Sequence, residues 1–255
     1  RVVRLLRDPG EVPPCRFDQR ELVAPAVYAV DFEDVKGQQH VKRALEVAAA
    51  GSHNVLLIGP PGAGKTMLAR RLPTILPEMS YDEMIEVTRV YSAAGLLAGS
   101  GTVSVRPFRS PHHTVTDAGL VGGGSVPKPG EVSLAHHGIL FLDELPEFRR
   151  RVLEDLRQPV EDGRVTVARS GYSVTFPASF MLVAAMNPCA DIRRGLEASG
   201  ADCTDSEKAR YYSKISGPLL DRIDIQLEVP EVKFRDIVSR TPAESSTAIR
   251  ARVTR

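Results

Sequence analysis

Gly59-Pro60-Pro61-Gly62-Ala63-Gly64-Lys65-Thr66 fits the pattern G-x-x-x-x-G-K-[ST] of a phosphate-binding loop at every fixed position. The run before it, residues 54–58, is short, apolar and branched, which is typical of a strand buried on both faces of a parallel sheet. Behind the loop, apolar residues recur at roughly helical spacing at Met67, Leu68, Leu72 and Ile75. The stretch therefore predicts a strand, a glycine-rich turn and the start of a helix.

A turn in this setting can bind an anion, because backbone N–H groups and the positive end of the helix converge on it. We expect ATP and Mg²⁺ as cofactors, with Lys65 reaching the terminal phosphates and Thr66 ligating the metal. The predicted nucleotide-binding residues are Gly59, Pro60, Pro61, Gly62, Ala63, Gly64, Lys65, Thr66 and Met67.

The length and composition of the chain limit the number of domains and the classes of partner that it can have. A chain of 255 residues suits one large domain or one domain with appendages, and a formal net charge of +1 indicates no class of partner. No apolar run approaches the ~20 residues that span a bilayer, and the first residues lack a signal-peptide pattern. We predict a cytoplasmic protein with no membrane partner. Because the chain opens on Arg1 rather than Met, we expect it to be part of a longer protein.

Apolar runs alternate with helical patterns along the rest of the chain. Residues 39–50 form a helical pattern expected to stop at Gly51, and a capping box at residues 80–83 opens a helix expected to reach about Leu97. A second capping box begins at Thr204. The further predicted segments are a helix at 145–158, strands at 139–142, 180–185 and 223–229, and a hairpin of 164–169 with 172–176. The pattern predicts an α/β sheet of parallel strands covered on both faces.

Two adjacent carboxylates supply what a phosphate-binding loop lacks. The strand at 139–142 ends in Asp143 and Glu144, so we assign Asp143 to Mg²⁺ and Glu144 to the base that polarises the attacking water. Asn187 ends another core strand, where ligands of open α/β sheets gather, although Asn-Pro is equally a turn signal. Arg222, between Asp221 and Asp224, fits either a surface ion pair or a group that stabilises charge in the site of a neighbouring subunit.

Together these stretches resemble AAA+ ATPases. Narrower motifs resemble the magnesium-chelatase-like group and, within it, the YifB/ComM family. These are Pro107-Phe108-Arg109-Ser110-Pro111-His112-His113, Gly122-Gly123-Gly124, residues 129–136 and residues 142–148. The resemblance runs from about Asp31 to Val232.

The resemblance implies a P-loop NTPase of three αβα layers around a central parallel sheet. It implies a ring-shaped homo-oligomer, expected to be a hexamer, with Asn187 as the sensor-1 residue and Arg222 as the arginine finger. Residues 99–130 become the insertion in the second helix and 164–176 the hairpin before sensor 1, both facing a central pore. The expected domains are a linker at 1–30, the ATPase core at 31–235, and the start of a helical lid at 236–255 that is mostly absent.

The sequence departs at its cysteines from the pattern of the family that it resembles. Similar proteins carry a cysteine cluster after the Asn-Pro, whereas this chain keeps Cys189 and Cys203, with Asp191 where another cysteine would stand. Two cysteines do not fill a tetrahedral zinc site, so structural zinc is not expected. With Cys15 they are also too few and too scattered for a disulfide framework, which fits a reducing compartment.

Two sets of polar residues have open interpretations. The pairs His112-His113 and His136-His137 invite a metal site, but adjacent residues point different ways, which favours ordinary loop and helix-start histidines. A second set of basic residues fits either a track for a phosphate backbone or a mixed-charge surface, since acidic residues are interleaved with it. The set is Arg106, Arg109, Lys128, Arg149, Arg150, Arg151, Arg164 and Arg169.

Three hypotheses for function remain. The leading one is a Mg²⁺-dependent ATP-hydrolysing motor module, which by resemblance acts on DNA like a branch-migration helicase linked to natural transformation. The second is the motor subunit of a chelatase that inserts Mg²⁺ into a porphyrin. The third is a nucleotide-binding fragment without useful turnover, because the lid and the neighbouring subunits are missing from the chain.

Overall fold

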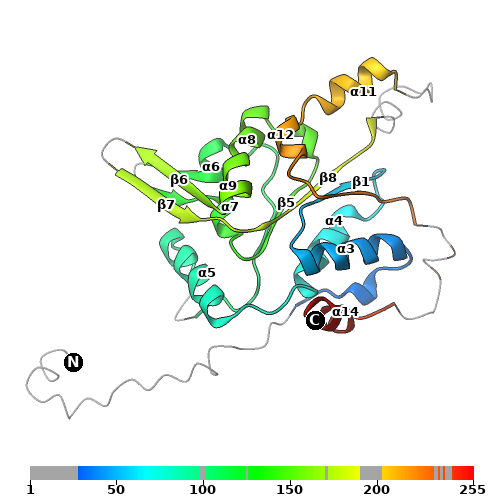
Figure 1. The fold of residues 1–255 in the computed structure, drawn as a ribbon, viewed down its shortest axis with the longest axis horizontal. Helices are drawn as coiled ribbons and strands as arrows, with labels where there is room; N and C mark the ends of the chain where they lie inside the picture. Colours follow the sequence, from blue (N-terminus) through cyan, green and yellow to red (C-terminus); the bar gives the residue numbers. More distant parts are fainter. Residues whose placement is uncertain are drawn as a thin grey trace, which may run out of the picture.

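The computed structural model describes residues 28–97, 101–124, 126–169, 172–189, 203–232, 235, 238 and 243–255. A parallel sheet in the order β2-β5-β8-β1-β9 forms its centre (Figure 1). These strands are β2 (Phe108–Arg109), β5 (Ile139–Leu142), β8 (Met181–Met186), β1 (Val55–Ile58) and β9 (Ile225–Glu228). Strand β1 lies between β8 and β9, so the chain reverses its direction of winding beside β1, and ligands of open α/β sheets bind at such a point.

Helices and two small antiparallel pairs complete the fold. The α-helices are α3 (Gln39–Gly51), α4 (Lys65–Arg71), α5 (Tyr81–Ala94), α6 (Asp117–Val121), α7 (Glu131–Leu134), α8 (Arg150–Asp155), α9 (Arg157–Asp162), α11 (Asp205–Tyr212), α12 (Gly217–Leu220) and α14 (Ser246–Val253). The 3-10 helices are η1 (Phe32–Asp34), η2 (Leu72–Thr74) and η3 (Leu145–Glu147). The antiparallel pairs are β3 (Gly122–Gly123) with β4 (Lys128–Pro129), and β6 (Arg164–Arg169) with β7 (Tyr172–Pro177).

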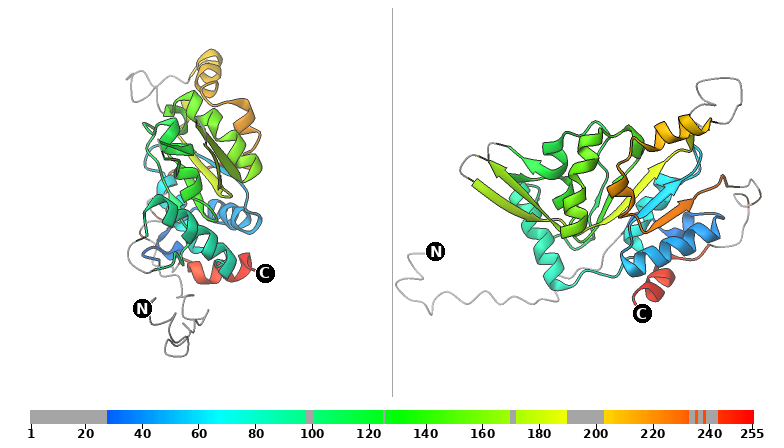
Figure 2. Two further views of the ribbon diagram at one scale, coloured as in Figure 1. Left: turned by 90° about the vertical axis from the view of Figure 1, so that its left-hand side faces the viewer. Right: turned by 45° about the horizontal axis from the view of Figure 1, so that its top comes forward.

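The central strands β5, β8 and β1 are packed on both faces, because their successive side chains point to opposite sides and each side meets apolar side chains of the helices. Val55 and Leu57 of β1 pack into one apolar cluster with α3, α4 and α14, whereas Leu56 packs into a second cluster with α6, α8 and α12. Strands β5 and β8 divide in the same way. Helices α3 and α14 lie side by side in Figures 1 and 2. The apolar runs of the sequence therefore fill two cores, one on each face.

The C-terminal helix α14 is fastened to the start of the described chain. Ser246 donates its backbone N–H to Asp31 Oδ1 at 2.8 Å, and its hydroxyl accepts the N–H of Phe32 at 2.8 Å. Ile249 and Val253 enter the same cluster as β1. The sequence placed the start of a lid here, and that role, like the domain bounds at 1–30, 31–235 and 236–255, stays a prediction. No helix among the described residues is long and apolar enough to cross a membrane.

Several predicted elements are confirmed. The runs at 54–58, 139–142 and 223–229 each contain a strand of the sheet, the run at 180–185 covers all but the last residue of β8, and both capping boxes form, at Ser80 and at Thr204. The predicted hairpin is the β6–β7 pair, which projects beyond α6 and α7 in Figure 1. Its turn, Ser170-Gly171, lies outside the described residues.

Three predicted bounds are wrong. Helix α3 includes Gly51 as its last residue, and Ser52, in the left-handed conformation (φ 52°), is its C-cap. Helix α5 ends at Ala94, because Gly95 adopts φ 75° before the predicted end at Leu97. The single helix expected at 145–158 is three short helices, because Phe148 is extended and Pro159 has no N–H to continue the ladder of α8.

Candidate functional site

The loop at 59–66 leaves β1 and closes on the first turn of α4. Gly62 and Gly64 have φ of 79° and 89°, in the left-handed region that favours glycine, and Gly64 is the N-cap of α4. At Gly59 a Cβ would collide with the backbone carbonyl of Val229, which follows the neighbouring strand β9. The loop thus needs its glycines both for its curvature and for its close approach to the sheet.

Lys65 holds its ammonium inside this loop. Its Nζ donates to the carbonyl oxygens of Gly59 at 2.6 Å and Pro60 at 2.9 Å, and to Asn187 Oδ1 at 2.8 Å. Asn187 arrives there because β8 pairs with β1, with Met186 opposite Ile58. The structure therefore brings Lys65 and Asn187 together at the carboxyl ends of adjacent strands, where an incoming phosphate would compete for the protons of the ammonium.

Thr66 and Asp143 also meet. The Thr66 hydroxyl donates to Asp143 Oδ2 at 2.6 Å, and the other carboxylate oxygen accepts the backbone N–H of Glu144 at 3.0 Å. A hydroxyl and a carboxylate oxygen in contact are hard oxygen ligands of the kind that Mg²⁺ prefers. The donor set thus fits the metal that the sequence predicted, and Thr66 and Asp143 are the residues that would hold it.

Glu144 stands at the entrance of the site. Its φ is 53° and its side chain is 59% exposed, so little packing holds the carboxylate. Glu144 Oε2 lies 3.5 Å from His113 Nδ1. The sequence pointed to Glu144 but gave His113 no role.

A cavity of about 390 Å³ joins these groups. It opens where β1, β5 and β8 end, beside the point at which the winding of the sheet reverses. Its lining residues are Pro61, Gly62, Gly64, Lys65, Thr66, Met67, Asp143, Glu144, Met186 and Asn187. Of the predicted site residues outside the loop, the cavity thus gathers Met67, Asp143, Glu144 and Asn187.

Arg222, the remaining predicted site residue, does not line this cavity. Its guanidinium donates to Glu161 Oε1 at 2.8 Å, and its backbone carbonyl accepts from Asn54 Nδ2 at 2.8 Å. Asn54 precedes β1, whereas the loop at 59–66 follows it, so Arg222 and the loop lie at opposite ends of that strand. The hydrogen bonds from Arg157 and Arg222 lower the pKa of Glu161, which is therefore an anionic partner at neutral pH.

Gln38 is a site neighbour that sequence reasoning missed. Its Nε2 donates to the carbonyl oxygens of Ala63 and Pro230, each at 2.9 Å, and so ties the loop to the segment after β9. Its Oε1 is buried and has no hydrogen-bond partner among the described residues. A buried acceptor beside a phosphate-binding loop fits an amino group on a bound ligand, as on an adenine ring. Single-sequence patterns carry no signal for this contact.

Asn187 is also held from the far side. The Tyr211 hydroxyl of α11 donates to the Asn187 carbonyl at 2.9 Å, and burial raises the pKa of Tyr211, so this group remains a donor. Two residues beyond Asn187, Cys189 is joined to Cys203 by a disulfide. The sequence had judged the cysteines too scattered for a disulfide framework, so this pairing corrects that expectation. With both thiols in the bond, no thiolate pair is left for zinc there.

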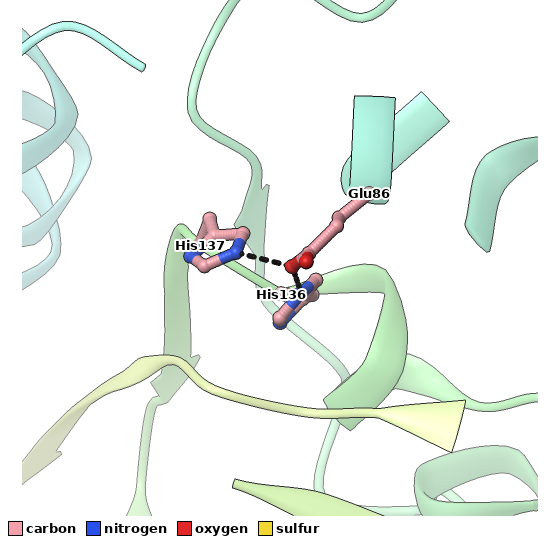
Figure 3. A group of neighbouring side chains, drawn as sticks. All are labelled: Glu86, His136 and His137. Carbon is pink, nitrogen blue, oxygen red and sulfur yellow. Dashed lines mark hydrogen bonds and ion pairs between the residues drawn. The ribbon is translucent and has the colours of Figure 1, made fainter. Parts of the chain in front are cut away.

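The histidines at 136–137 converge on one carboxylate of α5 (Figure 3). His136 Nε2 and His137 Nε2 lie 3.0 and 2.9 Å from Glu86 Oε2. The expectation that adjacent histidines point different ways is thus wrong for this pair, because both rings contact one carboxylate. Burial lowers the pKa of His136, and the hydrogen bonds from His137 and His136 lower the pKa of Glu86.

This three-residue cluster does not fit a metal ion. His136 Nδ1 accepts the backbone N–H of Ser179 at 3.1 Å, so a neutral imidazole carries its proton on Nε2. A ligating Nε2 would need a free lone pair, and metal-bound histidines instead donate their second N–H outward. The cluster is therefore a hydrogen-bonded link between α5 and the start of β5.

The basic residues are largely paired. Arg109 forms a two-point hydrogen bond with Glu131 at 2.6 and 2.7 Å, and Arg106 contacts Glu83 at 3.2 Å. Two further ion pairs join Arg150 to Glu154 and Arg151 to Asp117. Acidic and basic side chains are thus paired around these arginines. Lys128, Arg149 and Arg164 are exposed.

Comparison with known proteins gives this geometry a family context. Residues 31–237 match the family described as magnesium chelatase, subunit ChlI. The chain is 48% identical over 225 residues to the protein YifB of Escherichia coli (strain K12), covering 88% of the chain and 44% of YifB. It is 51% identical over 202 residues to competence protein ComM of Haemophilus influenzae, covering 79% of the chain and 39% of ComM. The chain thus spans less than half the length of these relatives.

A solved structure shares the fold. The complex between subunits BchI and BchD of magnesium chelatase, based on a single-particle cryo-EM reconstruction, contains a chain that matches with a TM-score of 0.57 and 24% identity. The match covers 87% of this chain and 65% of that one. The predicted fold class, an α/β P-loop NTPase with a central parallel sheet, is confirmed.

Proposed function

The chain belongs to the magnesium chelatase subunit ChlI family and to its YifB/ComM branch, and from this membership we propose that it is an ATP-hydrolysing motor module. One observation carries the proposal: Lys65, Thr66, Asp143, Glu144 and Asn187 line a single cavity at the carboxyl ends of three parallel strands. These groups are the parts that hydrolysis of a nucleoside triphosphate requires.

Each residue has a distinct task in this proposal. The backbone N–H groups of the loop and the start of α4 bind the phosphates, and Lys65 exchanges its contacts with the Gly59 and Pro60 carbonyls for phosphate oxygens. Mg²⁺ on Thr66 and Asp143 neutralises charge on those oxygens. Glu144 accepts a proton from the attacking water, and Asn187 orients that water or the terminal phosphate.

We further propose that the working unit is a ring, with a hexamer as the expected form, in the cytoplasm. The position of Arg222 supports this, because it lies at the opposite end of β1 from the loop of its own chain. In a head-to-tail ring the same residue would face the site of the next subunit. The structure that shares this fold is itself a complex, in which subunits BchI and BchD of magnesium chelatase are assembled together.

DNA is the proposed substrate of the motor. The support is the relative named competence protein ComM, since competence is uptake of DNA for natural transformation. Branch migration of DNA is the specific action we propose. The family description supports a second candidate, the motor subunit of a chelatase that inserts Mg²⁺ into a porphyrin. A third is a nucleotide-binding chain without useful turnover by itself.

The test is the ATPase rate of the full-length protein with single-stranded, duplex and branched DNA over a salt series. We expect stimulation, strongest with branched DNA, that weakens as salt screens the phosphates. Glu144→Gln should abolish turnover while ATP still binds, and Glu147→Gln, a nearby exposed carboxylate that contacts Lys214, serves as its matched control. Lack of stimulation by every DNA would remove the DNA proposal. Stimulation by a porphyrin instead would favour the chelatase.

A further inference from the structure

We infer that Tyr211 is a positioning residue, whose hydroxyl holds the backbone of Asn187 so that the side-chain amide of Asn187 stays directed into the cavity. This inference rests on the proposed hydrolytic function and adds to it a residue of α11. The Tyr211 hydroxyl donates to the Asn187 carbonyl oxygen at 2.9 Å. At the other end of the same residue, Asn187 Oδ1 accepts from Lys65 Nζ at 2.8 Å. Asn187 is thus held at its backbone by one group and at its side chain by another.

The sheet stops guiding the chain at Asn187. The last pair between β8 and β1 joins Met186 to Ile58, and the Met186 carbonyl accepts the N–H of Gly59 at 3.2 Å. Pro188 follows Asn187 and has no N–H, so it cannot donate to a strand ladder. The register of β8 therefore brings Asn187 to the cavity, but it does not by itself fix the direction of the side-chain amide.

Helix α11 reaches Asn187 from a later part of the chain and is connected to the end of β8 at two points. At the start of the helix, Cys203 directly precedes the N-cap Thr204 and is bonded to Cys189, two residues beyond Asn187. In its last turn, Tyr211 packs its half-buried ring on the apolar cluster to which β8 contributes. The hydroxyl thus approaches Asn187 from a ring that packing already holds in place.

The two contacts of Asn187 respond differently to a nucleotide. A phosphate that takes protons of the Lys65 ammonium competes with Asn187 Oδ1, whereas the Tyr211 hydroxyl contacts a backbone oxygen and does not compete. Burial raises the pKa of Tyr211, so its hydroxyl keeps the proton that it donates. The Tyr211 contact therefore holds Asn187 while the amide is released from Lys65. Misorientation of a group beside the reacting atoms costs rate rather than affinity for ATP.

The experiment compares Tyr211→Phe with Tyr212→Phe in the full-length protein, without thiol reductant so that the Cys189–Cys203 bond stays closed. Tyr211→Phe removes the hydroxyl and keeps the packed ring. We expect it to lower turnover at saturating ATP about fivefold, with the Kd for ATP unchanged within about twofold. Tyr212→Phe makes the same chemical change at the neighbouring tyrosine, which is 40% exposed, and should leave the rate unchanged.

A second comparison separates positioning from a general loss of structure. Single-turnover hydrolysis, with enzyme in excess over ATP, is measured for Asn187→Ala with and without Tyr211→Phe. Once the Asn187 amide is gone, the hydroxyl has no side chain to position, so adding Tyr211→Phe should lower the rate by less than about twofold. A structural defect would instead multiply the two losses.

The outcomes separate the two proposals. An active parent whose Tyr211→Phe variant keeps its rate, gains rate, or loses ATP binding overturns the inference alone. So does an equal loss of rate in Tyr212→Phe, or a full further loss when Tyr211→Phe is added to Asn187→Ala. A parent without turnover under any condition overturns the proposed function, and this inference with it.

Discussion

Arg222 offers the sharpest test of an assembled site. The loop at 59–66 and Arg222 are separated by the length of β1, whose four residues span ~13 Å at the rise of a strand. Asn54 holds the Arg222 carbonyl at that end of β1, and the Arg222 side chain contacts Glu161, so the role we propose for it is in the site of a different copy of the chain. We therefore predict that Arg222→Ala leaves ATP binding intact and removes turnover.

The size of the effect follows from the role. An arginine that stabilises the transferring phosphoryl group contributes a factor of roughly 10³–10⁵ in kcat, or about 4–7 kcal/mol of the barrier. Loss of the Glu161 contact contributes little, because the pair is a surface ion pair with 43% of the Arg222 side chain exposed. Arg222→Lys should not rescue, since an ammonium lacks the planar fork of donors.

The assay mixes Arg222→Ala subunits with Lys65→Ala subunits. Each variant alone should be inactive, but a mixed ring places an intact loop of one variant against an intact arginine of the other. For equal amounts and independent sites, about a quarter of the interfaces would be complete in a head-to-tail ring. Arg157→Ala is the matched control, because Arg157 donates to the same Glu161 oxygen at 3.1 Å. Co-assembled rings without any recovery, or an Arg222→Ala protein that stays active alone, would refute the reasoning.

Three further predictions concern the metal, the core and acid. Asp143→Asn should raise the Mg²⁺ concentration for half-maximal turnover about tenfold or more, measured by Mg²⁺ titration of the ATPase, because the Thr66–Asp143 pair loses its charge. Leu57→Ala, at a fully buried position of β1, should lower the free energy of unfolding measured in urea by about 2–5 kcal/mol, while Val47→Ala on the exposed side of α3 should change it by less than about 0.5 kcal/mol. The unfolding midpoint should fall as pH drops below about 6.5, because the lowered pKa of His136 makes the unfolded state bind a proton before the folded state does. The stabilisation from Glu86, whose pKa is also lowered, should be lost at still lower pH. His136→Gln should flatten the upper part of the plot of unfolding midpoint against pH, and an unchanged plot would contradict the reasoning.

Local patterns predicted the strands and the cavity because the physics behind them is local. The apolar runs before Gly59 and Asp143 had to be buried, and the carboxyl ends of parallel strands had to meet at the same end of the sheet. The contacts of Lys65 with Asn187 and of Thr66 with Asp143 follow from that topology once the strand order is known. The strand order itself, however, depends on which strands pair, and no single stretch of sequence encodes it.

The missed features are long-range. Strand β2 has two residues inside a segment rich in Gly, Pro and Ser, so it shows no period, and its pairing with β5 alone makes it a strand. The convergence of His136 and His137 on Glu86 depends on the left-handed conformation of His137, with φ 54°, which no pattern at that residue announces. The Cys189–Cys203 bond likewise depends on where α11 begins relative to the end of β8.

The proposed site is divided between the two ends of the parallel strands, and this division separates ATP binding from ATP hydrolysis. The groups proposed to hold a nucleotide all lie at the carboxyl ends of the parallel strands of one chain, so we expect affinity for ATP to need no neighbouring subunit. Arg222, the group proposed to stabilise the transition state, lies at the opposite end of β1, so in this proposal it acts only in an assembly of subunits.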